Sequence, residues 1–440
     1  MKGTPPIVSI VGRPNVGKST LFNRIIGKRD AIVDPTEGVT RDRKYAEATW
    51  SGHNFILIDT GGYDARSEDV ILASVKEQAE IALDESDLIL FIVDASTGIT
   101  VGDDDLARLM HKKSKKVLLV ANKADNEKSE LSVFEFLKLG LGEPLAISAE
   151  SGRRTGDLLD AVISHFPSNL AETEKSEDEI SIAVVGVPNS GKSSFVNKLL
   201  EEERQIVTDI PGTTRDSADS LLIYNDQSFS LIDTAGLRKK AKVKDNIEFY
   251  STVRARRAMA RSDVVTVIID AARGGLQNQD VSVIIEALEK NKCLVCAVNK
   301  WDLIEKDTHT QKHWLADIHE ILPLLEYYPV LFISALTGQR VFKVLDVASE
   351  IYTESQKRIK TRDLNDWLKK LVQITSPPSY RGKFVKLSFV NQTQSVPPTF
   401  VFFTNEPEGI KDNYKRFLEA NLRAAFGFFG VPISLTFKLK

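Results

Sequence analysis

The chain contains one sequence unit twice, and this duplication constrains its fold more than any other feature. Three early segments return 174 positions later without a slip in register: GRPNVGKS at 12–19 and GVPNSGKS at 186–193, GVTRD at 38–42 and GTTRD at 212–216, and IDTGG at 58–62 and IDTAG at 232–236. Two later segments return at larger offsets: NKAD (122–125) as NKWD (299–302), and SAE (148–150) as SAL (334–336). Such a repeat predicts two copies of one domain rather than a single large core.

Each copy alternates short apolar runs with helical stretches, as in LILFIVD at 88–94. Near-continuous apolar runs of this length, bounded by turn residues, are typical of parallel strands that are buried on both faces. We therefore expect two α/β domains, each with a mostly parallel sheet and helices on both faces.

Composition suggests where the domains end. The segment PSNLAETEKSEDE is acidic and poor in apolar residues, which is typical of a solvated linker. After Ser349 the alternation stops, and a small α+β pattern follows. We expect domains at 4–167, 180–354 and 355–440, with an acidic linker at 168–179.

Charge is distributed unevenly along the chain. Residues 355–440 carry 15 Lys and Arg against six Asp and Glu, a net charge of +9, whereas the whole chain has a net charge of −3. The rest of the chain is therefore strongly acidic. A basic terminal domain on an acidic body predicts a polyanionic partner for that end.

The chain shows neither an export signal nor a membrane span. Its start, MKGTPPIVSIVG, has no long apolar signal region, and no apolar run approaches the roughly 18 residues that cross a bilayer. We therefore expect a cytoplasmic protein without membrane contact.

Cys293 and Cys296 form a C-x-x-C motif, which raises the question of a zinc or redox site. They lie in an apolar run, and residues three apart on a strand face opposite sides, about 10 Å from each other. A zinc site also needs two further ligands. We predict that both are buried core thiols.

The segments at 12–19 and 186–193 follow the pattern G-x-x-x-x-G-K-[ST]. In this pattern backbone N–H groups surround phosphates at a helix N-terminus, where the helix dipole favours negative charge. Lys18 and Lys192 are expected to reach the β- and γ-phosphates and to act in catalysis. The predicted phosphate-binding residues are Gly12, Arg13, Pro14, Asn15, Val16, Gly17, Lys18, Ser19 and Thr20 in the first copy, and Gly186, Val187, Pro188, Asn189, Ser190, Gly191, Lys192, Ser193 and Ser194 in the second.

A magnesium ion is expected beside each phosphate loop, because Mg²⁺ prefers oxygen ligands and is commonly held by few protein groups together with substrate phosphates. The loop serine, the aspartate that ends an apolar strand and, when a γ-phosphate is present, a threonine of the GxTRD segment supply suitable oxygens. The predicted magnesium ligands are Ser19, Thr40 and Asp59 in the first copy and Ser193, Thr214 and Asp233 in the second.

The glycines that end the IDTGG and IDTAG segments can donate backbone N–H groups to the γ-phosphate. Groups that contact only the triphosphate make a loop a switch, ordered before hydrolysis and released afterwards. The predicted contacts are Thr60, Gly61 and Gly62 in the first copy and Thr234, Ala235 and Gly236 in the second; Thr40, Gly62, Thr214 and Gly236 are also assigned to catalysis.

The NKxD segments predict which base is bound. A carboxylate at Asp125 or Asp302 can accept hydrogen bonds from guanine N1–H and its 2-amino group, whereas adenine presents an acceptor at N1. GTP is therefore expected and ATP excluded. The remaining predicted base contacts are Asn122, Lys123, Ser148 and Ala149 in the first copy and Asn299, Lys300, Ser334 and Ala335 in the second, with the alanine N–H directed at guanine O6.

Two tandem P-loop GTPase units with P-N-x-G-K-S loops, followed by a basic α+β domain, resemble the Der (EngA) family of bacterial GTPases, which belongs to the TRAFAC class with Era and TrmE. The resemblance covers nearly the whole chain. It implies a KH-like C-terminal domain, association with the precursor of the 50S ribosomal subunit and its rRNA, and domain rearrangement controlled by GTP.

Both copies lack the glutamine that orients the attacking water in Ras-like enzymes, since Tyr63 follows Gly62 and Leu237 follows Gly236 at that position. Catalysis by positioning and charge stabilisation remains possible without it, so slow hydrolysis is expected. The resemblance further implies that Asn15 and Asn189 hold an activating K⁺ beside the phosphates. The alternative is that each asparagine only caps or braces its loop.

The two predicted switch loops differ in charge. Residues 63–70 carry three acids and one arginine, whereas 237–244 carry five Lys and Arg and no acid. We expect the basic run at 238–244 to contact rRNA or an acidic protein surface such as the other GTPase domain. The alternative is a solvated surface without a partner.

The terminal domain is expected to contain a helix from Thr361, strands at 383–390 and 399–404, a helix at 411–426 and a strand at 433–439. Gly427 to Gly430 match the G-x-x-G of nucleic-acid-binding KH loops, but a helix C-cap with a hydrophobic contact is the simpler interpretation. In the strand TFVFFT, Phe400 and Phe402 share one face, expected in the core; the other face is expected to dock on a GTPase domain, or alternatively to stack RNA bases.

The leading hypothesis is thus a monomeric GTP-hydrolysing factor of large-subunit assembly that binds GTP or GDP, the 50S subunit and rRNA. A second hypothesis is an RNA-binding module in which GTP selects a conformation and hydrolysis is marginal. A third is a tRNA-modification or membrane-associated GTPase, which would need a further catalytic or anchoring element.

Overall fold

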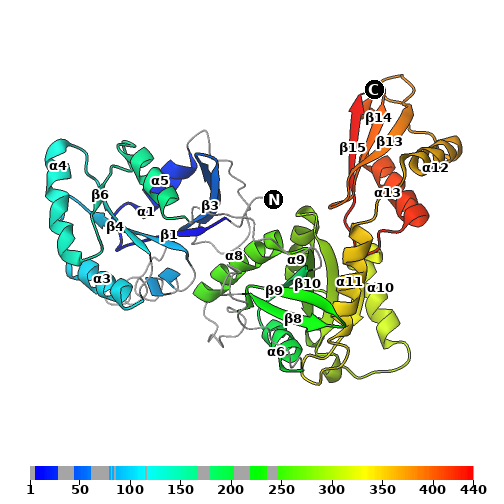
Figure 1. Cartoon of the computed structure of the whole chain (residues 1–440), viewed down its shortest axis with the longest axis horizontal. Helices are drawn as coiled ribbons and strands as arrows, with labels where there is room; N and C mark the ends of the chain where they lie inside the picture. The colour runs from blue at the N-terminus through cyan, green and yellow to red at the C-terminus, as the bar shows by residue number, and fades with distance from the viewer. Residues whose placement is uncertain are drawn as a thin grey trace. The chain divides into compact units, whose positions relative to one another are not determined.

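The computed structural model describes residues 5–27, 44–60, 79–80, 82–83, 86–113, 116–166, 179–202, 219–234 and 245–439 (Figure 1). The chain divides into two compact units, of which the first contains the N-terminal sheet and the second contains the other two sheets. Each unit is described by itself. Within the described ranges, no helix has both the length and the hydropathy that a bilayer crossing requires.

The first unit is built on a six-stranded sheet. Its strands lie in the order β2 (Lys44–Trp50), β3 (His53–Asp59), β1 (Ile7–Val11), β4 (Leu88–Asp94), β5 (Val117–Asn122) and β6 (Leu145–Ala146). All neighbours are parallel except β2, which pairs antiparallel with β3. Every residue of β4 is buried, because helices cover both faces of the sheet.

The helices of the first unit are α1 (Lys18–Ile26), α3 (Val101–Lys113), α4 (Glu127–Ser132), the 3₁₀ segment η1 (Val133–Leu139) and α5 (Thr155–Ser164). α1 and α5 share one hydrophobic cluster with the sheet, in which Leu21 and Leu158 are fully buried. α3 lies on the opposite side of the sheet from α5 (Figure 1). Three layers result, as the alternating sequence pattern predicts.

The second unit repeats this sheet. Its strands lie in the order β12 (Val330–Phe332), β11 (Cys293–Asn299), β10 (Val264–Asp270), β7 (Glu179–Val185), β9 (Gln227–Ile232) and β8 (Ser220–Tyr224). β8 is again the only antiparallel strand of this sheet in the described residues. Read from the opposite edge, the order matches that of the first sheet, so duplication of a mostly parallel α/β domain is confirmed.

Four helices around the second sheet follow the strands that correspond to those before α1, α3, α4 and α5 in the first unit, and α8 precedes β10. They are α6 (Lys192–Glu202), α8 (Asp245–Arg261), α9 (Asn278–Glu289), α10 (Thr310–Ile321) and α11 (Lys343–Ser355), with 3₁₀ segments η2 (Ala271–Arg273), η3 (Trp301–Leu303) and η4 (Pro323–Tyr327). Cys293 and Cys296 are buried, unpaired residues of β11. Burial raises the pKa of each thiol to about 12, so the prediction of core thiols is confirmed.

The terminal part of the chain forms a three-stranded sheet with two long helices. Its elements are α12 (Thr361–Ile374), β13 (Leu387–Gln394), β14 (Thr399–Thr404), η5 (Pro407–Gly409), α13 (Asp412–Phe426) and β15 (Ser434–Leu439). β14 lies in the centre, antiparallel to β13 and parallel to β15. The α+β prediction is confirmed, but the first strand begins at Leu387, four residues later than expected.

The two faces of β14 differ in burial. Phe400 and Phe402 are fully buried in the core, as predicted. On the other face Val401 is buried but Phe403 is only half-buried, and its neighbour Phe389 on β13 is 40% exposed. The Phe389 and Phe403 rings lie 5.8 Å apart. Docking of this face on a GTPase domain therefore stays a prediction.

The loop after α13 joins the terminal domain to the second GTPase-like sheet. α13 ends at Phe426, and the Gly427 N–H donates to Arg423 O at 2.8 Å. The Gly430 N–H donates to Tyr327 O at 2.8 Å, and Gly430 O accepts from the Leu294 N–H of β11 at 3.0 Å. The G-x-x-G segment is thus a helix C-cap with a structural contact, as the simpler interpretation predicts.

Phe428 is the hydrophobic centre of this joint. It is fully buried in a cluster that continues from the second sheet through α11 into the terminal domain. Its N–H donates to Glu354 Oε1 at 2.8 Å, and its carbonyl accepts from Arg423 Nη1 at 2.6 Å. Phe429, the next residue, is 54% exposed.

We expect Phe428→Ala to lower the free energy of unfolding by about 3–5 kcal/mol, since it empties a large buried volume. Phe429→Ala, the adjacent control, should change it by less than about 1 kcal/mol because that ring is half in solvent. Urea denaturation followed by circular dichroism measures both. Equal losses in the two variants would contradict the assignment of Phe428 to the joint.

Candidate functional site

Each glycine-rich loop connects the first parallel strand of its sheet to the helix that begins at the loop lysine. Asn15 and Asn189 have left-handed backbones, with φ of 63° and 62°, and Gly17 and Gly191 have φ of 93° and 98°. A Cβ on Gly17 would lie 2.3 Å from Asn122 Nδ2, and the same atom on Gly191 would lie 2.1 Å from the equivalent amide of the second copy. Only glycine fits here, since both φ and space exclude a side chain.

The two loop lysines fold back against their own loops, where Lys18 is buried and Lys192 is half-buried. Lys18 Nζ donates to Gly12 O at 2.9 Å and to Arg13 O at 2.8 Å, and Lys192 Nζ donates to Val187 O at 2.8 Å. Burial lowers the pKa of each ammonium group to about 8. An anionic ligand at the loop would favour the charged form, so these lysines are suited to binding phosphate.

The first copy brings two predicted magnesium ligands together. Ser19 Oγ, at the start of α1, donates to Asp59 Oδ2 at 2.6 Å, and Asp59 is 1% exposed at the end of β3. A hydroxyl and a carboxylate at this separation form an oxygen donor set that suits a small hard cation.

The second copy arranges the equivalent aspartate differently. Asp233 has a left-handed backbone, with φ of 55°, and its N–H donates to Asp219 Oδ1 at 2.8 Å. Its Oδ2 lies 3.9 Å from Arg254 Nε of α8. Burial raises the pKa of Asp233, and the nearby arginines oppose this shift. Within the described residues Ser193 forms no hydrogen bond with Asp233, so only the first copy shows the paired arrangement.

The asparagine of each NKxD segment connects two loops. Asn122 Nδ2 donates to Val16 O at 2.7 Å, and Asn299 Nδ2 donates to Ser190 O at 2.9 Å. The Oδ1 atoms accept from the N–H groups of Ala149 and Ala335, both at 2.9 Å. The alanine N–H that the sequence assigns to guanine O6 is thus bonded to the asparagine in this structure. We call this arrangement the asparagine brace.

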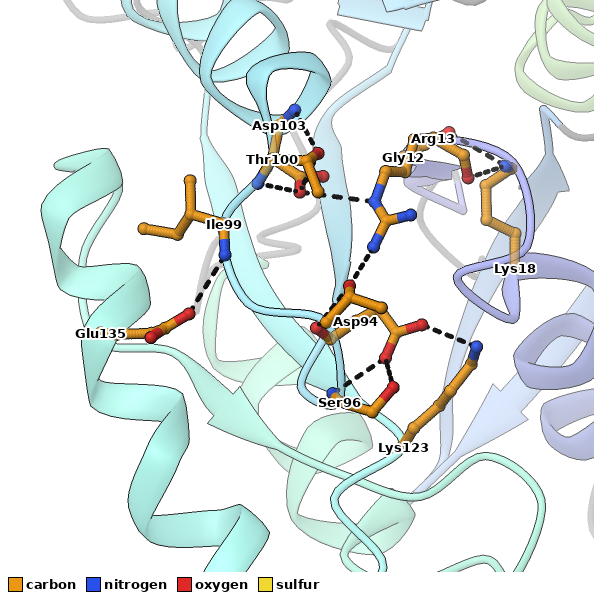
Figure 2. A network of polar contacts seen from close by, with 11 residues as sticks. Gly12, Arg13, Lys18, Asp94, Ser96, Ile99, Thr100, Asp103, Lys123 and Glu135 are labelled. Atoms are coloured by element: carbon orange, nitrogen blue, oxygen red, sulfur yellow. Dashed lines mark hydrogen bonds and ion pairs between the residues drawn. The ribbon is translucent and has the colours of Figure 1, made fainter.

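The lysines of the same segments pair with a strand-end aspartate that the sequence interpretation missed. Lys123 Nζ lies 2.7 Å from Asp94 Oδ2 at the end of β4 (Figure 2), and Lys300 Nζ lies 2.6 Å from Asp270 Oδ2 at the end of β10. Burial raises the pKa of Asp94, but hydrogen bonds from Lys123 and Ser96 outweigh it and hold that pKa below its usual range. Aspartate at the end of an apolar strand in both copies was the signal that could have found this pair.

The two base-reading acids differ in exposure. Asp125 is exposed, whereas Asp302 is half-buried and its Oδ1 is buried with no hydrogen-bond partner among the described residues. Ser148 and Ser334 are fully buried, and each hydroxyl accepts a backbone N–H three residues on, at 3.2 and 3.1 Å. Both segments therefore present a free carboxylate beside a fixed loop.

The remaining loop and strand-end residues lie around these groups. Thr60 Oγ1 donates to Ile10 O at 2.6 Å, and Thr234 Oγ1 lies 2.6 Å from Ser220 Oγ. The outer residues of the phosphate loops, exposed or half-buried, are Pro14, Asn15, Ser19, Thr20, Pro188, Asn189, Ser193 and Ser194. The predicted residues outside the described part of the chain are Thr40, Gly61, Gly62, Tyr63, Thr214, Ala235, Gly236, Leu237 and the basic run at 238–244, so their roles stay predictions.

Family models match most of this chain. A model described as a 50S ribosome-binding GTPase matches residues 7–123 and again 181–300. A model described as the KH-domain-like C-terminal region of EngA bacterial GTPase enzymes matches residues 358–438. The two matches of the first model fall on the two copies that the repeat predicts.

Curated relatives match the chain over its whole length. It is 50% identical over 433 residues to the GTPase Der of Clostridium tetani, covering 98% of each chain. It is also 50% identical over 437 residues to the GTPase Der of Chloroherpeton thalassium, covering 99% of this chain and 100% of the relative. Two tandem GTPase domains and a KH-like terminal domain are thereby confirmed, and the chain belongs to the Der (EngA) family of GTPases.

Proposed function

We propose that both copies bind GTP with Mg²⁺ and hydrolyse it slowly, and that the nucleotide state rearranges the domains during assembly of the large ribosomal subunit. The asparagine brace carries this proposal. In each copy the asparagine side chain donates to the phosphate loop and accepts from the loop that contains Ala149 or Ala335, which we call the alanine loop. These bonds are 2.7 to 2.9 Å long, so they hold the base-reading segment at a fixed place relative to the phosphate loop.

Guanine recognition follows from the acids beside the brace. The unpartnered Asp302 Oδ1 can accept a hydrogen bond from guanine N1–H or its 2-amino group, and leaving it unpaired against adenine would cost the desolvation of a charged group. Asp125 has the equivalent position in the first copy. We also propose that the asparagine and alanine of each brace contact the guanine base, as the sequence predicts.

At the phosphate end, this chain's own groups bind and orient the triphosphate. Lys18, which is buried, and Lys192, which is half-buried, each place a positive charge at the loop, where it would balance charge that develops on the phosphoryl oxygens. Ser19 and Asp59, or Ser193 and Asp233, would hold a bound Mg²⁺, which would neutralise negative charge on the triphosphate. Thr40, Gly62, Thr214 and Gly236 are proposed to contact the γ-phosphate.

We further propose that Asn15 and Asn189 hold an activating K⁺. Both side chains are exposed at the loop and form no hydrogen bond with the described residues, so their amide oxygens are available to a cation. A positive charge there would add to the stabilisation of the transition state in a chain whose glutamine position holds tyrosine or leucine.

We propose that the chain acts in the cytoplasm as a monomer and that its partner is the 50S subunit with its rRNA. The net charge of +9 in residues 355–440 and the basic run at 238–244 are suited to phosphate contacts. The G-x-x-G loop is not part of this proposal, since Phe428 and Gly430 are engaged in the joint with β11.

To test base recognition, we expect Asp302→Asn in an Asp125→Asn background to weaken GDP binding about 100-fold, because two hydrogen bonds to a charged acceptor are lost. Xanthosine diphosphate should bind in its place, since its 2-carbonyl accepts from an amide. Titration with fluorescent nucleotides measures both. Asp317→Asn, an exposed control on α10, should have no effect; undiminished GDP binding by the double variant would refute guanine recognition by these acids.

To test the role of K⁺, GTP turnover is compared in KCl and NaCl at equal ionic strength. We expect faster turnover in KCl, and we expect Asn189→Ala to remove this difference at the second site and Asn15→Ala at the first. Equal rates of the unaltered chain in the two salts would exclude K⁺ activation.

To test ribosome contact, the triple reversal Lys239→Glu, Lys240→Glu and Lys242→Glu is sedimented with 50S subunits under GTP, GDP and a non-hydrolysable analogue. We expect less co-sedimentation than for the unaltered chain, with a weaker salt dependence. Reversal of Lys290, Lys306 and Lys312, which lie outside this run, is the matched control. Unchanged co-sedimentation of the first variant would argue against a contact by the basic run.

A further inference from the structure

The two phosphate loops differ in charge at one position: Arg13 in the first copy corresponds to Val187 in the second. The Arg13 side chain extends from the loop to the segment between β4 and α3 (Figure 2). Its Nη2 donates to Thr97 Oγ1, and its Nε lies 3.4 Å from Asp103 Oδ2. Because the Arg13 side chain is 22% exposed and that of Asp103 is 0% exposed, this is a largely buried ion pair.

The carboxylate that Arg13 meets is held by its own helix. Asp103 Oδ2 accepts from the Thr100 N–H at 3.1 Å and from Thr100 Oγ1 at 2.7 Å, at the start of α3. Arg13 therefore contacts a carboxylate that already has a fixed position. A rigid partner fixes the guanidinium, which in turn fixes the phosphate loop that carries it.

The same segment leads to the base-reading end of the site. Thr97, the other partner of Arg13, donates its N–H to Asp94 O at 3.3 Å. Asp94 is held by Ser96, whose N–H and Oγ donate to it at 2.9 and 2.6 Å, and it pairs with Lys123 at 2.7 Å (Figure 2). Arg13 thus connects the phosphate loop through Thr97 and Asp94 to the NKxD lysine.

The second copy keeps two parts of this network, the lysine–aspartate pair and the buried acid at the start of its helix, whereas Ala272 and Arg273 stand where the first copy has Ser96 and Thr97. Lys300 pairs with Asp270 at 2.6 Å, and the Gln277 N–H donates to Asp280 Oδ2 at 3.1 Å at the start of α9. Asp280 is 1% exposed, and its Oδ1, like Asp103 Oδ1 in the first copy, has no hydrogen-bond partner within the described ranges. Val187, which is 5% exposed, offers it no donor.

Burial raises the pKa of Asp280, whereas the hydrogen bond from Gln277 and the charge of Arg273 lower it. Asp280 has no ion pair within the described part of the chain. The chain thus retains an acid in the second copy at the place where the first copy neutralises it with arginine.

We propose that Arg13 is a positioning residue that holds the first phosphate loop in its binding conformation before nucleotide arrives, whereas the second loop, which has the asparagine brace but not this tie, is held less firmly until nucleotide binds. This inference rests on the proposed binding of guanine nucleotide at both loops. A loop that is already ordered loses less conformational freedom on binding, so the first site gains affinity from the tie without any new contact to the ligand.

Positioning can be distinguished from simple attraction of phosphate by charge. Removing Arg13 weakens binding under either explanation. Asp103→Asn keeps the arginine charge and the Thr97 hydrogen bond but removes the ion pair, so it weakens binding only if Arg13 acts by positioning; if Arg13 acts by charge alone, the loss of a nearby acid strengthens binding.

The test uses the full chain and a fluorescent GDP analogue. First-site affinity is measured in an Asp302→Asn background. We expect Arg13→Val and Asp103→Asn each to weaken first-site affinity about fivefold, which is the lower end of the range typical of energetic coupling. The double variant should bind no more weakly than either single variant, because both substitutions remove the same interaction. Arg108→Val, which breaks the exposed Arg108 to Asp104 pair of 2.6 Å on the same helix, is the matched control and should have no effect.

Two further measurements separate positioning from a folding defect. Amide hydrogen exchange of residues 13–17 should be faster in Arg13→Val than in the unaltered first site without nucleotide, and equal with saturating GDP. In an Asp125→Asn background, Val187→Arg should tighten GDP binding at the second site by a similar factor, since the new guanidinium meets Asp280.

Unchanged first-site affinity and loop exchange in Arg13→Val would overturn the inference, and so would tighter binding by Asp103→Asn. If the unaltered chain bound no guanine nucleotide at either site, the proposed function would fail and the inference with it. Normal binding by the unaltered chain together with an unaffected Arg13→Val would refute the inference alone.

Discussion

The asparagine brace is the interaction on which each nucleotide site depends. One primary amide donates to the phosphate loop and accepts from the alanine loop, so it joins segments more than 100 and about 30 residues away in the chain. It is buried in both copies, where a lost partner leaves a polar group unsatisfied at a cost of about 1–3 kcal/mol. The glycine that precedes each loop lysine is required because this amide occupies the space of a Cβ.

Much of the fold could be predicted from the sequence because the motifs repeat and the strands are short, apolar and buried. The duplication, the mostly parallel sheets and the α+β character of the terminal domain are confirmed by the strand orders and by the family matches. The start of β13 was placed four residues early, because KFVKLSFV has the alternation of a strand throughout, whereas pairing with β14 begins at Leu387. Register is set by the partner strand, which a local pattern does not contain.

The candidate site was predictable only as far as motifs define it. The lysine partners Asp94 and Asp270, the Arg13 to Asp103 pair and the position of Asp233 beside Arg254 all join residues distant in sequence. Each depends on which side chains the strand ends and helix starts bring within hydrogen-bond reach, and only the lysine partners leave a signal in the sequence, the aspartate that ends an apolar strand in both copies. Conversely, the literal G-x-x-G match proved to be a buried joint, because its middle residue Phe428 packs in the core.

The burial of both native cysteines has a practical consequence. Burial raises the pKa of each thiol to about 12, so the reactive thiolate form is rare at neutral pH, and both side chains are buried within β11. Reagents that alkylate exposed thiolates should therefore leave the native chain unmodified. A cysteine introduced on the surface of each unit would then be the selective attachment point for a donor and an acceptor dye, and energy transfer between them would test whether the two units move when nucleotide is exchanged.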